Sequence, residues 1–341
     1  MHTKQMSDVS SDDDERGPRL GMVHRRGFAG SADPAAGFAA ESEAGSNMEN
    51  FIKAKVGEAT RLAMEKNPNP VLWGGMAYDE WGIPIVQEWD PLTMEPPDGT
   101  RVLYGKRRTG KSWLCRWLLW VRRKSFPKGI VFSNTERLNH WYTKFMPPNT
   151  VLPYKSTTLQ ALHNVQAKAR MAANYEELAK DNPDFNRCFV VMDDVVADPH
   201  EFDSDRPLNT MYTQGRHYDE DGYFCTQHLK AVPARCRGNS DVIYSFKTDD
   251  LDTRDYLWVL GGSAWGSELL FNYQYSMATL GNGVFIMNRS NAEDDTLTTK
   301  FYTYLAPGPE EQYRMGLIER PDPKAPPTFR LCSQALWLAG T

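Results

Sequence analysis

The sequence predicts an α/β fold in which helices flank a mostly parallel sheet. Short apolar runs alternate along the chain with longer stretches of helical spacing, which is the pattern of strand-helix-strand units. The first strong run leads through a glycine-containing turn into a stretch where Leu114, Trp117, Leu118 and Val121 repeat at helical spacing. We therefore expect a buried strand, a tight turn and an amphipathic helix at this point.

The expected strands and one long helix can be placed along the chain. Thr157, followed three residues later by Gln160, has the capping-box pattern, and this predicts one long helix that ends near Asp181-Asn182-Pro183. Seven apolar runs are expected to form strands: Arg101 to Tyr104, Gly129 to Ser133, Cys188 to Met192, Gly222 to Thr226, Asp241 to Phe246, Val284 to Asn288 and Phe301 to Leu305.

Composition narrows the class of protein. The chain has 341 residues, of which 40% are hydrophobic and 24% charged, and this is enough to bury one main core. The formal net charge of -5 argues against a protein that coats nucleic acid with its whole surface, but it allows a local basic patch. Its five cysteines are scattered without a C-x-x-C pair, which indicates neither a disulfide framework nor a zinc cluster.

The same features indicate where the protein works and how it is organised. The cysteine usage fits a reducing, intracellular compartment. Its most apolar helical stretch, Trp113 to Val121, is too short to span a bilayer, so no membrane association is expected. We expect a flexible, disordered tail over residues 1–47, one main domain over 48–318 and a proline-rich extension over 319–341.

The turn after the first strand has the pattern of a phosphate-binding P-loop. It reads Gly105-Lys106-Arg107-Arg108-Thr109-Gly110-Lys111-Ser112. The two glycines let the backbone wrap an anion so that amide groups face it. In this pattern Lys111 brings a charge to the β and γ phosphates, and Ser112 places a hydroxyl on Mg²⁺. The motif therefore predicts ATP and Mg²⁺ as ligands of an NTPase.

A second part of the site is expected where the apolar run from Cys188 ends in two carboxylates. Asp193 is expected to hold Mg²⁺ through water, and Asp194 to orient or deprotonate the attacking water. Gln227 follows a third strand, and strand ends at the carboxyl edge of such a sheet face the nucleotide. We therefore expect Gln227 to donate to the γ phosphate and to accept from the water.

Arginines flank this third strand on both sides. An arginine that reaches the γ phosphate of a neighbouring subunit stabilises the transition state and couples hydrolysis to assembly. Arg216 is the first candidate for this role and Arg237 the second. His217 and His228 have no partner at metal-binding spacing and are interpreted as structural or solvent-facing.

Together these segments resemble the genome-packaging ATPases of large nucleocytoplasmic DNA viruses, of the poxvirus type within the FtsK/HerA branch of P-loop ATPases. The resemblance covers about Arg101 to Lys247 and departs from the family's small loop residues at Lys106-Arg107-Arg108. Its carrying segments are Val102 to Ser112, the run into Asp193-Asp194, Gly215-Arg216-His217, Thr226-Gln227, Pro233 with Arg237-Gly238-Asn239, and Tyr244 to Lys247. It implies a RecA-like fold, a homo-oligomeric ring, double-stranded DNA and capsid or portal proteins as partners, and ATP-driven packaging of DNA.

Alternative functions remain open at this stage. A helicase or a conjugation-type DNA pump uses the same ATP site, and the sequence barely separates it from a packaging motor. A small-molecule or nucleotide kinase needs a phosphoryl acceptor in place of water, and Asp194 with Gln227 favours water. A scaffold that binds but does not hydrolyse nucleotide is less consistent with the retained Lys111 and paired aspartates. The absence of an N-K-x-D guanine-reading motif in a suitable place favours ATP over GTP.

Overall fold

The computed structural model describes residues 34–69, 72–195, 202–290 and 296–307. The chain divides into two compact units, Met1–Asn50 and Phe51–Thr341. Of the first unit, the described residues belong to the beginning of helix α1 (Pro34–Lys66). Helix α1 therefore begins inside the segment expected to be a flexible tail. Its first residues are rich in alanine and begin with proline, which favour a helix start. Residues 1–33 and the proline-rich extension over 319–341 lie outside the described residues.

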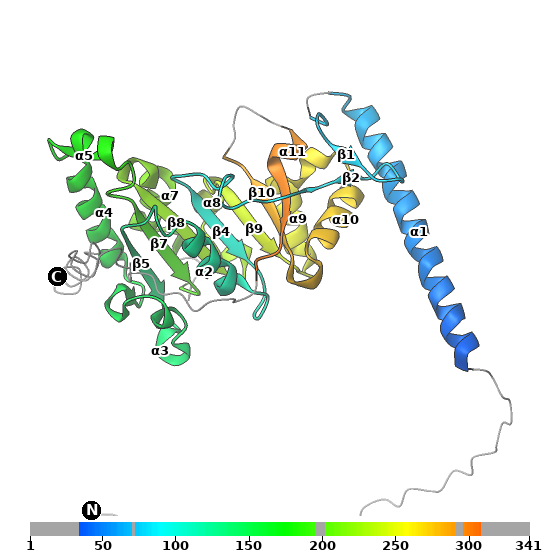
Figure 1. The fold of residues 1–341 in the computed structure, drawn as a ribbon, viewed down its shortest axis with the longest axis horizontal. Coiled ribbons are helices and arrows are strands. Elements are labelled where there is room, and N and C mark those ends of the chain that lie inside the picture. Colours follow the sequence, from blue (N-terminus) through cyan, green and yellow to red (C-terminus); the bar gives the residue numbers. More distant parts are fainter. Residues whose placement is uncertain (1–33, 70–71, 196–201, 291–295, 308–341) are drawn as a thin grey trace, which may run out of the picture. The chain divides into compact units, whose positions relative to one another are not determined.

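A nine-stranded sheet forms the centre of the second unit (Figure 1). The order of its strands is β3-β11-β10-β9-β4-β8-β7-β5-β6. Their bounds are β3 Gln87–Glu88, β4 Thr100–Tyr104, β5 Lys128–Ser133, β6 Val151–Leu152, β7 Cys188–Asp193, β8 Glu220–Thr226, β9 Val242–Phe246, β10 Val284–Asn288 and β11 Phe301–Tyr304. Strands β1 (Ala77–Tyr78) and β2 (Pro84–Ile85) form a separate antiparallel pair.

The sheet is parallel where the site lies. Strands β4, β5, β6, β7, β8 and β9 pair in parallel, whereas β10 is antiparallel to both β9 and β11. Strand β8 lies between β4, which leads into the P-loop, and β7, which ends in the aspartates. This order is that of RecA-like P-loop NTPases, and the predicted fold class is confirmed. The seven expected strands all form, with bounds shifted by at most two residues.

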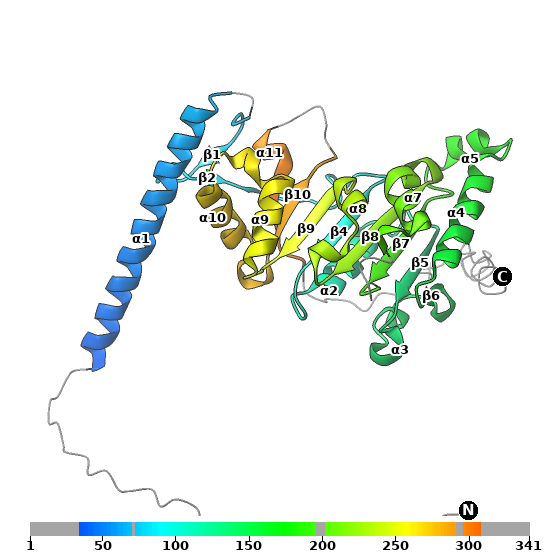
Figure 2. The same ribbon diagram turned by 180° about the vertical axis from the view of Figure 1, so that it is seen from behind.

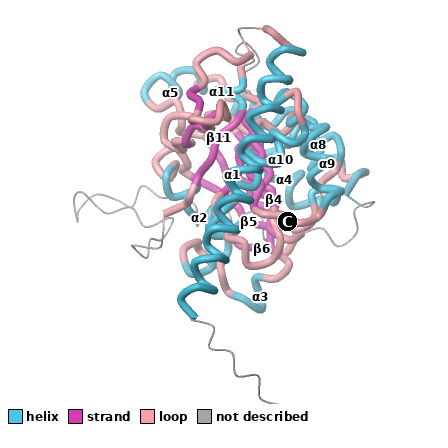
Figure 3. Tube along the Cα trace, turned by 90° about the vertical axis from the view of Figure 1, so that its right-hand side faces the viewer, coloured by secondary structure: helices cyan, strands magenta, loops and turns pink. Residues whose placement is uncertain are grey.

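Helices cover both faces of the sheet (Figures 1 and 2). Leu114, Cys115, Leu118 and Leu119 of α2 (Lys111–Val121) are buried in one apolar cluster with the strand residues of that face. A second cluster joins the opposite face to residues of α4 (Ser156–Arg170), α7, α8, α9 and α10. Figure 3, turned by 90°, shows the strands between these helices. The bounds of the remaining helices are α3 Glu136–Asn139, α7 Arg206–Gln214, α8 Ala234–Gly238, α9 Leu251–Leu260, α10 Glu268–Ala278 and α11 Leu297–Lys300.

The expected long helix after Thr157 is wrong in two respects. The segment forms two helices, α4 (Ser156–Arg170) and α5 (Tyr175–Asp181), separated by a short turn. The capping box does not form, because Gln160 Nε2 donates forward to Asn164 Oδ1 at 3.1 Å. The residue before α4 is Lys155, and its side chain makes no cap hydrogen bond. Asn174, a residue type that favours helix caps over helix interiors, precedes α5, and its side chain makes no cap hydrogen bond.

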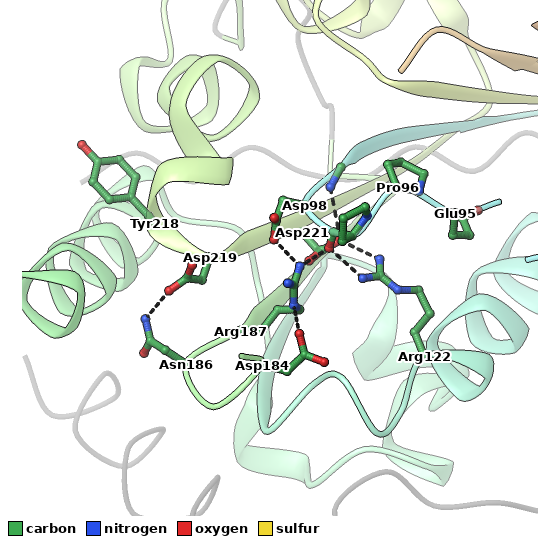
Figure 4. A network of polar contacts seen from close by, with 12 residues as sticks. Glu95, Pro96, Asp98, Arg122, Asp184, Asn186, Arg187, Tyr218, Asp219 and Asp221 are labelled. Carbon is green, nitrogen blue, oxygen red and sulfur yellow. Dashed lines mark hydrogen bonds and ion pairs between the residues drawn. The ribbon is translucent and has the colours of Figure 1, made fainter. Parts of the chain in front are cut away.

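A buried ionic network holds the amino ends of the strands (Figure 4). Asp221 of β8 accepts from Arg101 at 2.9 Å and from Arg122 at 2.7 Å, and Arg187 lies 3.4 Å away. The side chains of Arg101 and Asp221 are fully buried, and each has further partners of opposite charge, Glu95 for Arg101 and Arg122 and Arg187 for Asp221. This network fixes the edge of the sheet opposite the P-loop.

Candidate active site

The site lies at the carboxyl edge of the parallel strands. Tyr104 of β4 pairs with Thr226 of β8, and Asp193 of β7 pairs with Cys225 of β8. Adjacent parallel strands therefore end side by side, and the residues that follow them meet. The structure brings together the P-loop, both aspartates and Gln227, as the sequence predicts.

The P-loop has the geometry of an anion cradle. Gly105 cannot be replaced freely, because an added Cβ would lie 2.5 Å from Thr109 Oγ1 and 2.8 Å from Phe246 Cβ. Gly110 has a φ of 102°, in the region that favours glycine. The backbone turns at residues 107 and 108, between the two glycines. The loop directly precedes α2, and the amides at such a position bind phosphate in P-loops.

Lys111 points back into this loop. Its Nζ donates to the carbonyl of Lys106 at 2.9 Å, and the residue is 7% exposed. Burial lowers the pKa of the Lys111 ammonium, while Asp193 and Asp194 act in the opposite direction. A phosphate in the cradle would supply the anionic partner that this buried ammonium lacks, which fits the predicted role.

The hydroxyl and carboxylate expected to hold Mg²⁺ are adjacent. Ser112 Oγ donates to Asp193 Oδ2 at 3.3 Å, and Tyr142 donates to the same oxygen at 3.0 Å. Burial, followed by the charge of Asp194, raises the pKa of Asp193 to about 6. A divalent cation would offset both effects. The described residues contain no group of three or more His, Cys, Asp or Glu side chains suited to a metal, and nucleotide-bound Mg²⁺ needs none because phosphates and water complete its shell.

Asp194 and Gln227, the two residues expected to handle the attacking water, contact each other. Gln227 Nε2 donates to Asp194 Oδ2 at 2.8 Å, and Gln227 Oε1 accepts from Arg107 Nε at 3.2 Å. Asp194 has a φ of 48°, a left-handed conformation that costs about 1 kcal/mol in a residue other than glycine. Such strain turns this carboxylate away from the strand direction, toward Gln227 rather than Ser112.

Arg216 lies at the opposite edge of the sheet. It belongs to the 3-10 helix Gly215–Tyr218, which precedes β8, whereas Gln227 follows β8. The strand separates them by about 20 Å at ~3.3 Å per residue. Arg216 is exposed and lines a polar pocket of about 230 Å³ together with Thr213, Asn239 and Asp241. It therefore cannot reach the P-loop of its own chain.

Arg237 is held within its own subunit. Its Nε donates to Tyr256 at 2.8 Å, and its Nη1 donates to the carbonyl of Lys230 at 2.9 Å and also to those of Leu229 and Val232. These contacts fix the turn between β8 and α8. The side chain that was the second candidate for a trans-acting arginine is therefore engaged in local structure.

The histidines and cysteines are not assigned a role in the site. His217 and His228 are exposed, as expected. Cys115, Cys188, Cys225 and Cys236 are free and buried, and Cys332 lies outside the described residues. Among the described residues, none of the helices combines the length and apolar character needed to cross a membrane.

Two contacts of the site were not predictable from a sequence motif. Tyr142 is buried and donates to Asp193, but it follows β5 in a short 3-10 helix that has no motif. The P-loop pattern predicts a role only for the backbone of Arg107, and it does not predict the contact of its side chain with Gln227. The only signal for the second was the unusual basic filling of the loop.

Fold and site together define the chain as a P-loop NTPase. No protein-family model matches it. It is 30% identical over 147 residues to an uncharacterized protein of invertebrate iridescent virus 6, a match that covers 43% of this chain and 53% of that one. It is 23% identical over 202 residues to an uncharacterized protein of Acanthamoeba polyphaga mimivirus, covering 58% and 69%. A protein of frog virus 3 is 26% identical over 46% of this chain and 47% of its own length.

The matches thus span 53%, 69% and 47% of the lengths of these three relatives. The resemblance to proteins of large DNA viruses is confirmed by these matches. Among solved structures, the genome packaging NTPase of Sulfolobus turreted icosahedral virus 2 with ATP-gammaS matches with a TM-score of 0.41 and 14% identity, over 62% of this chain and 98% of that one. The pCW3 conjugation coupling protein matches with a TM-score of 0.40 and 15% identity, over 65% and 69%.

Proposed function

We propose that this protein is an ATP-hydrolysing motor that moves double-stranded DNA and packages a viral genome into a capsid. The observation that carries the enzymatic part is the meeting of the P-loop with two distinct carboxylates at one sheet edge. Ser112 contacts Asp193, and Gln227 contacts Asp194. The two aspartates are thus already divided between a metal side and a water side.

Each side chain has a defined task in this proposal. The loop amides and Lys111 bind the β and γ phosphates, and Ser112 with Asp193 holds Mg²⁺. Bound there, Mg²⁺ supplies charge neutralisation at the phosphate oxygens. Asp194 accepts the proton of the attacking water, and Gln227 orients that water against the γ phosphate. A kinase would need an acceptor where this pair places water.

The DNA part of the proposal is supported by the order of the motifs and by the viral relatives. Arg101 to Lys247 carries the segments that resemble packaging ATPases, and the curated matches are proteins of large DNA viruses. A ring is supported by the position of Arg216, which is exposed at the edge away from its own P-loop. In a ring, that edge can face the nucleotide of a neighbour. Capsid or portal proteins would then be further partners.

The test is ATP hydrolysis with and without linear double-stranded DNA. The proposal predicts Mg²⁺-dependent hydrolysis that DNA increases, with a stimulation that weakens as salt rises because phosphate-backbone contacts are screened. Lys111→Ala should abolish nucleotide binding or turnover while the protein stays folded, since this lysine contacts phosphate rather than the core. Hydrolysis by folded Lys111→Ala at the wild-type rate would refute the site. If DNA has no effect at any salt, the motor function is wrong.

A further inference from the structure

The loop between Gly105 and Gly110 carries three consecutive basic residues with three different surroundings. Lys106 Nζ lies 3.8 Å from Asp249 Oδ2 at the surface. Arg108 is exposed and has a φ of 64°. Arg107 alone of the three reaches across the site, where its Nε donates to Gln227 Oε1 at 3.2 Å. The three basic side chains of the loop therefore differ in their contacts and do not form one uniform solvated surface.

The Arg107 contact engages the amide on which water positioning depends. Gln227 accepts from Arg107 through its oxygen and donates to Asp194 through its nitrogen at 2.8 Å. In the proposed reaction the same amide must accept from the attacking water and donate to the γ phosphate. Arg107 and Asp194 thus hold both ends of Gln227 in an orientation that differs from the reacting one.

This hold is weak enough to be exchanged for a phosphate. Arg107 is exposed, and hydrogen bonds at exposed charged side chains contribute less than about 1 kcal/mol. Within the described residues its Nη groups have no acceptor, so the guanidinium keeps unused donors. Arginine and phosphate form charge-assisted, often bidentate hydrogen bonds that are roughly twice as strong as neutral ones. Arg107 also follows Gly105 by two residues, inside the turn that wraps the phosphates.

We propose that Arg107 is a phosphate-contacting residue that acts within its own subunit. It holds Gln227 before ATP binds, turns to the terminal phosphate of bound ATP, and thereby releases Gln227 to orient the attacking water. The positive charge then lies where negative charge develops in the transition state. This inference rests on the proposed function, because it requires ATP in the cradle.

The test compares Arg107→Ala with Arg108→Ala, which removes the same charge from the same loop but breaks no side-chain contact with Gln227. Both variants should lose nucleotide affinity to a similar, few-fold extent, measured as the Kd for Mg²⁺-ATP. Arg107→Ala should in addition lower kcat by roughly 10²-fold or more, the size of effect seen when a transition-state donor is removed. Arg107→Lys should recover part of kcat because it restores the charge without the fork. Equal kcat values for the two alanine variants would overturn the inference.

Two further measurements separate the mechanism from a structural role. In a double-mutant cycle, Gln227→Ala should lower kcat by a smaller factor in the Arg107→Ala background than in the wild type, because the two residues act in successive steps of one mechanism. Simple additivity would contradict the coupling. Mixed Arg107→Ala and Lys111→Ala subunits should recover no hydrolysis, since each cradle needs both residues from the same chain. Recovery would place Arg107 in trans and overturn the inference, whereas a wild type that does not hydrolyse ATP would overturn the proposed function with it.

Discussion

At the scale of residues, the two aspartates at the end of β7 differ in backbone conformation and in the side chains that they contact. Asp193 ends the strand and faces Ser112, while Asp194 adopts a left-handed φ of 48° and faces Gln227. Their types and positions were predictable because strand ends of a parallel sheet meet at one edge. Tyr142 was not predictable, since its contact with Asp193 depends on how the segment after β5 folds over the site.

Asp194→Asn tests this separation. The substitution keeps the size of the side chain and one acceptor oxygen for Gln227 but removes the base, so Mg²⁺-ATP binding should persist while kcat falls about 10² to 10⁴-fold. Titration with Mg²⁺-ATP and single-turnover hydrolysis measure the two effects. Asp193→Asn is the matched comparison, and it should instead weaken the affinity for Mg²⁺. If Asp194→Asn loses nucleotide affinity, the aspartates have exchanged roles.

At the scale of elements, α4 is attached to the sheet through a buried charged pair. His163 Nδ1 lies 2.8 Å from Glu220 Oε1, and His163 Nε2 lies 2.9 Å from the carbonyl of Pro207. Both ring nitrogens face acceptors, which requires the doubly protonated ring. Burial opposes the charge, but the hydrogen bond and charge of Glu220 outweigh it and raise the pKa of His163. Burial likewise raises the pKa of Glu220.

These shifts predict a loss of stability as pH rises. A raised His163 pKa gives stability that is complete below the ordinary histidine value near 6.5 and is lost as pH passes the folded-state pKa. The Glu220 shift has the same sign but acts in the acidic range, above its ordinary value of 4.5. His163→Gln should therefore cost about 3 kcal/mol at pH 6 and clearly less at pH 9, measured by urea unfolding. An equal cost at both pH values would show that His163 is neutral in the fold.

The turn between β8 and α8 depends on Arg237. Its contacts with Tyr256 and several carbonyls predict that Arg237→Ala lowers the free energy of unfolding by about 2 kcal/mol, because the partly buried carbonyls of Leu229 and Val232 lose their donor. Arg235→Ala, on the exposed side of the same helix, should change it by less than about 0.5 kcal/mol. Chemical denaturation measures both. A stable Arg237→Ala protein with lost ATPase activity would return Arg237 to the trans-acting role.

Element boundaries were less predictable than element types. The seven strands were predictable because strands inside the sheet are buried and therefore appear in the sequence as apolar runs. The break between α4 and α5 was missed because the prediction rested on a capping box that does not form. Gln160 bonds Asn164 instead, and Asn174 precedes a second helix. The short strands β3 and β6 were missed as well, since two-residue strands carry no periodicity.

At the scale of the whole molecule, the separation of Arg216 from its own P-loop is a consequence of topology. The sequence placed Arg216 before a strand and Gln227 after it, and the parallel sheet puts these at opposite edges. An exposed arginine at that edge can contact a bound nucleotide only if another chain binds that nucleotide. The subunit arrangement itself cannot be read from one sequence, because it depends on surfaces that carry no motif.

A mixing experiment tests action in trans. An equimolar mixture of Arg216→Ala and Lys111→Ala subunits should recover part of the DNA-stimulated hydrolysis that neither variant shows alone. Interfaces with an intact cradle on one chain and an intact arginine on the other will form in the mixture. Normal hydrolysis by Arg216→Ala with DNA present would remove this residue from the mechanism.

The central claim, that this ATP site drives movement along duplex DNA, is tested most directly by displacement of a triplex-forming strand from linear double-stranded DNA. A translocating motor pushes the third strand off as it passes, without separating the duplex. The account predicts displacement by the wild type with Mg²⁺ and ATP, none with a non-hydrolysable analogue, and none by Lys111→Ala. Robust ATP hydrolysis without displacement, or displacement that proceeds equally in Lys111→Ala, would contradict it.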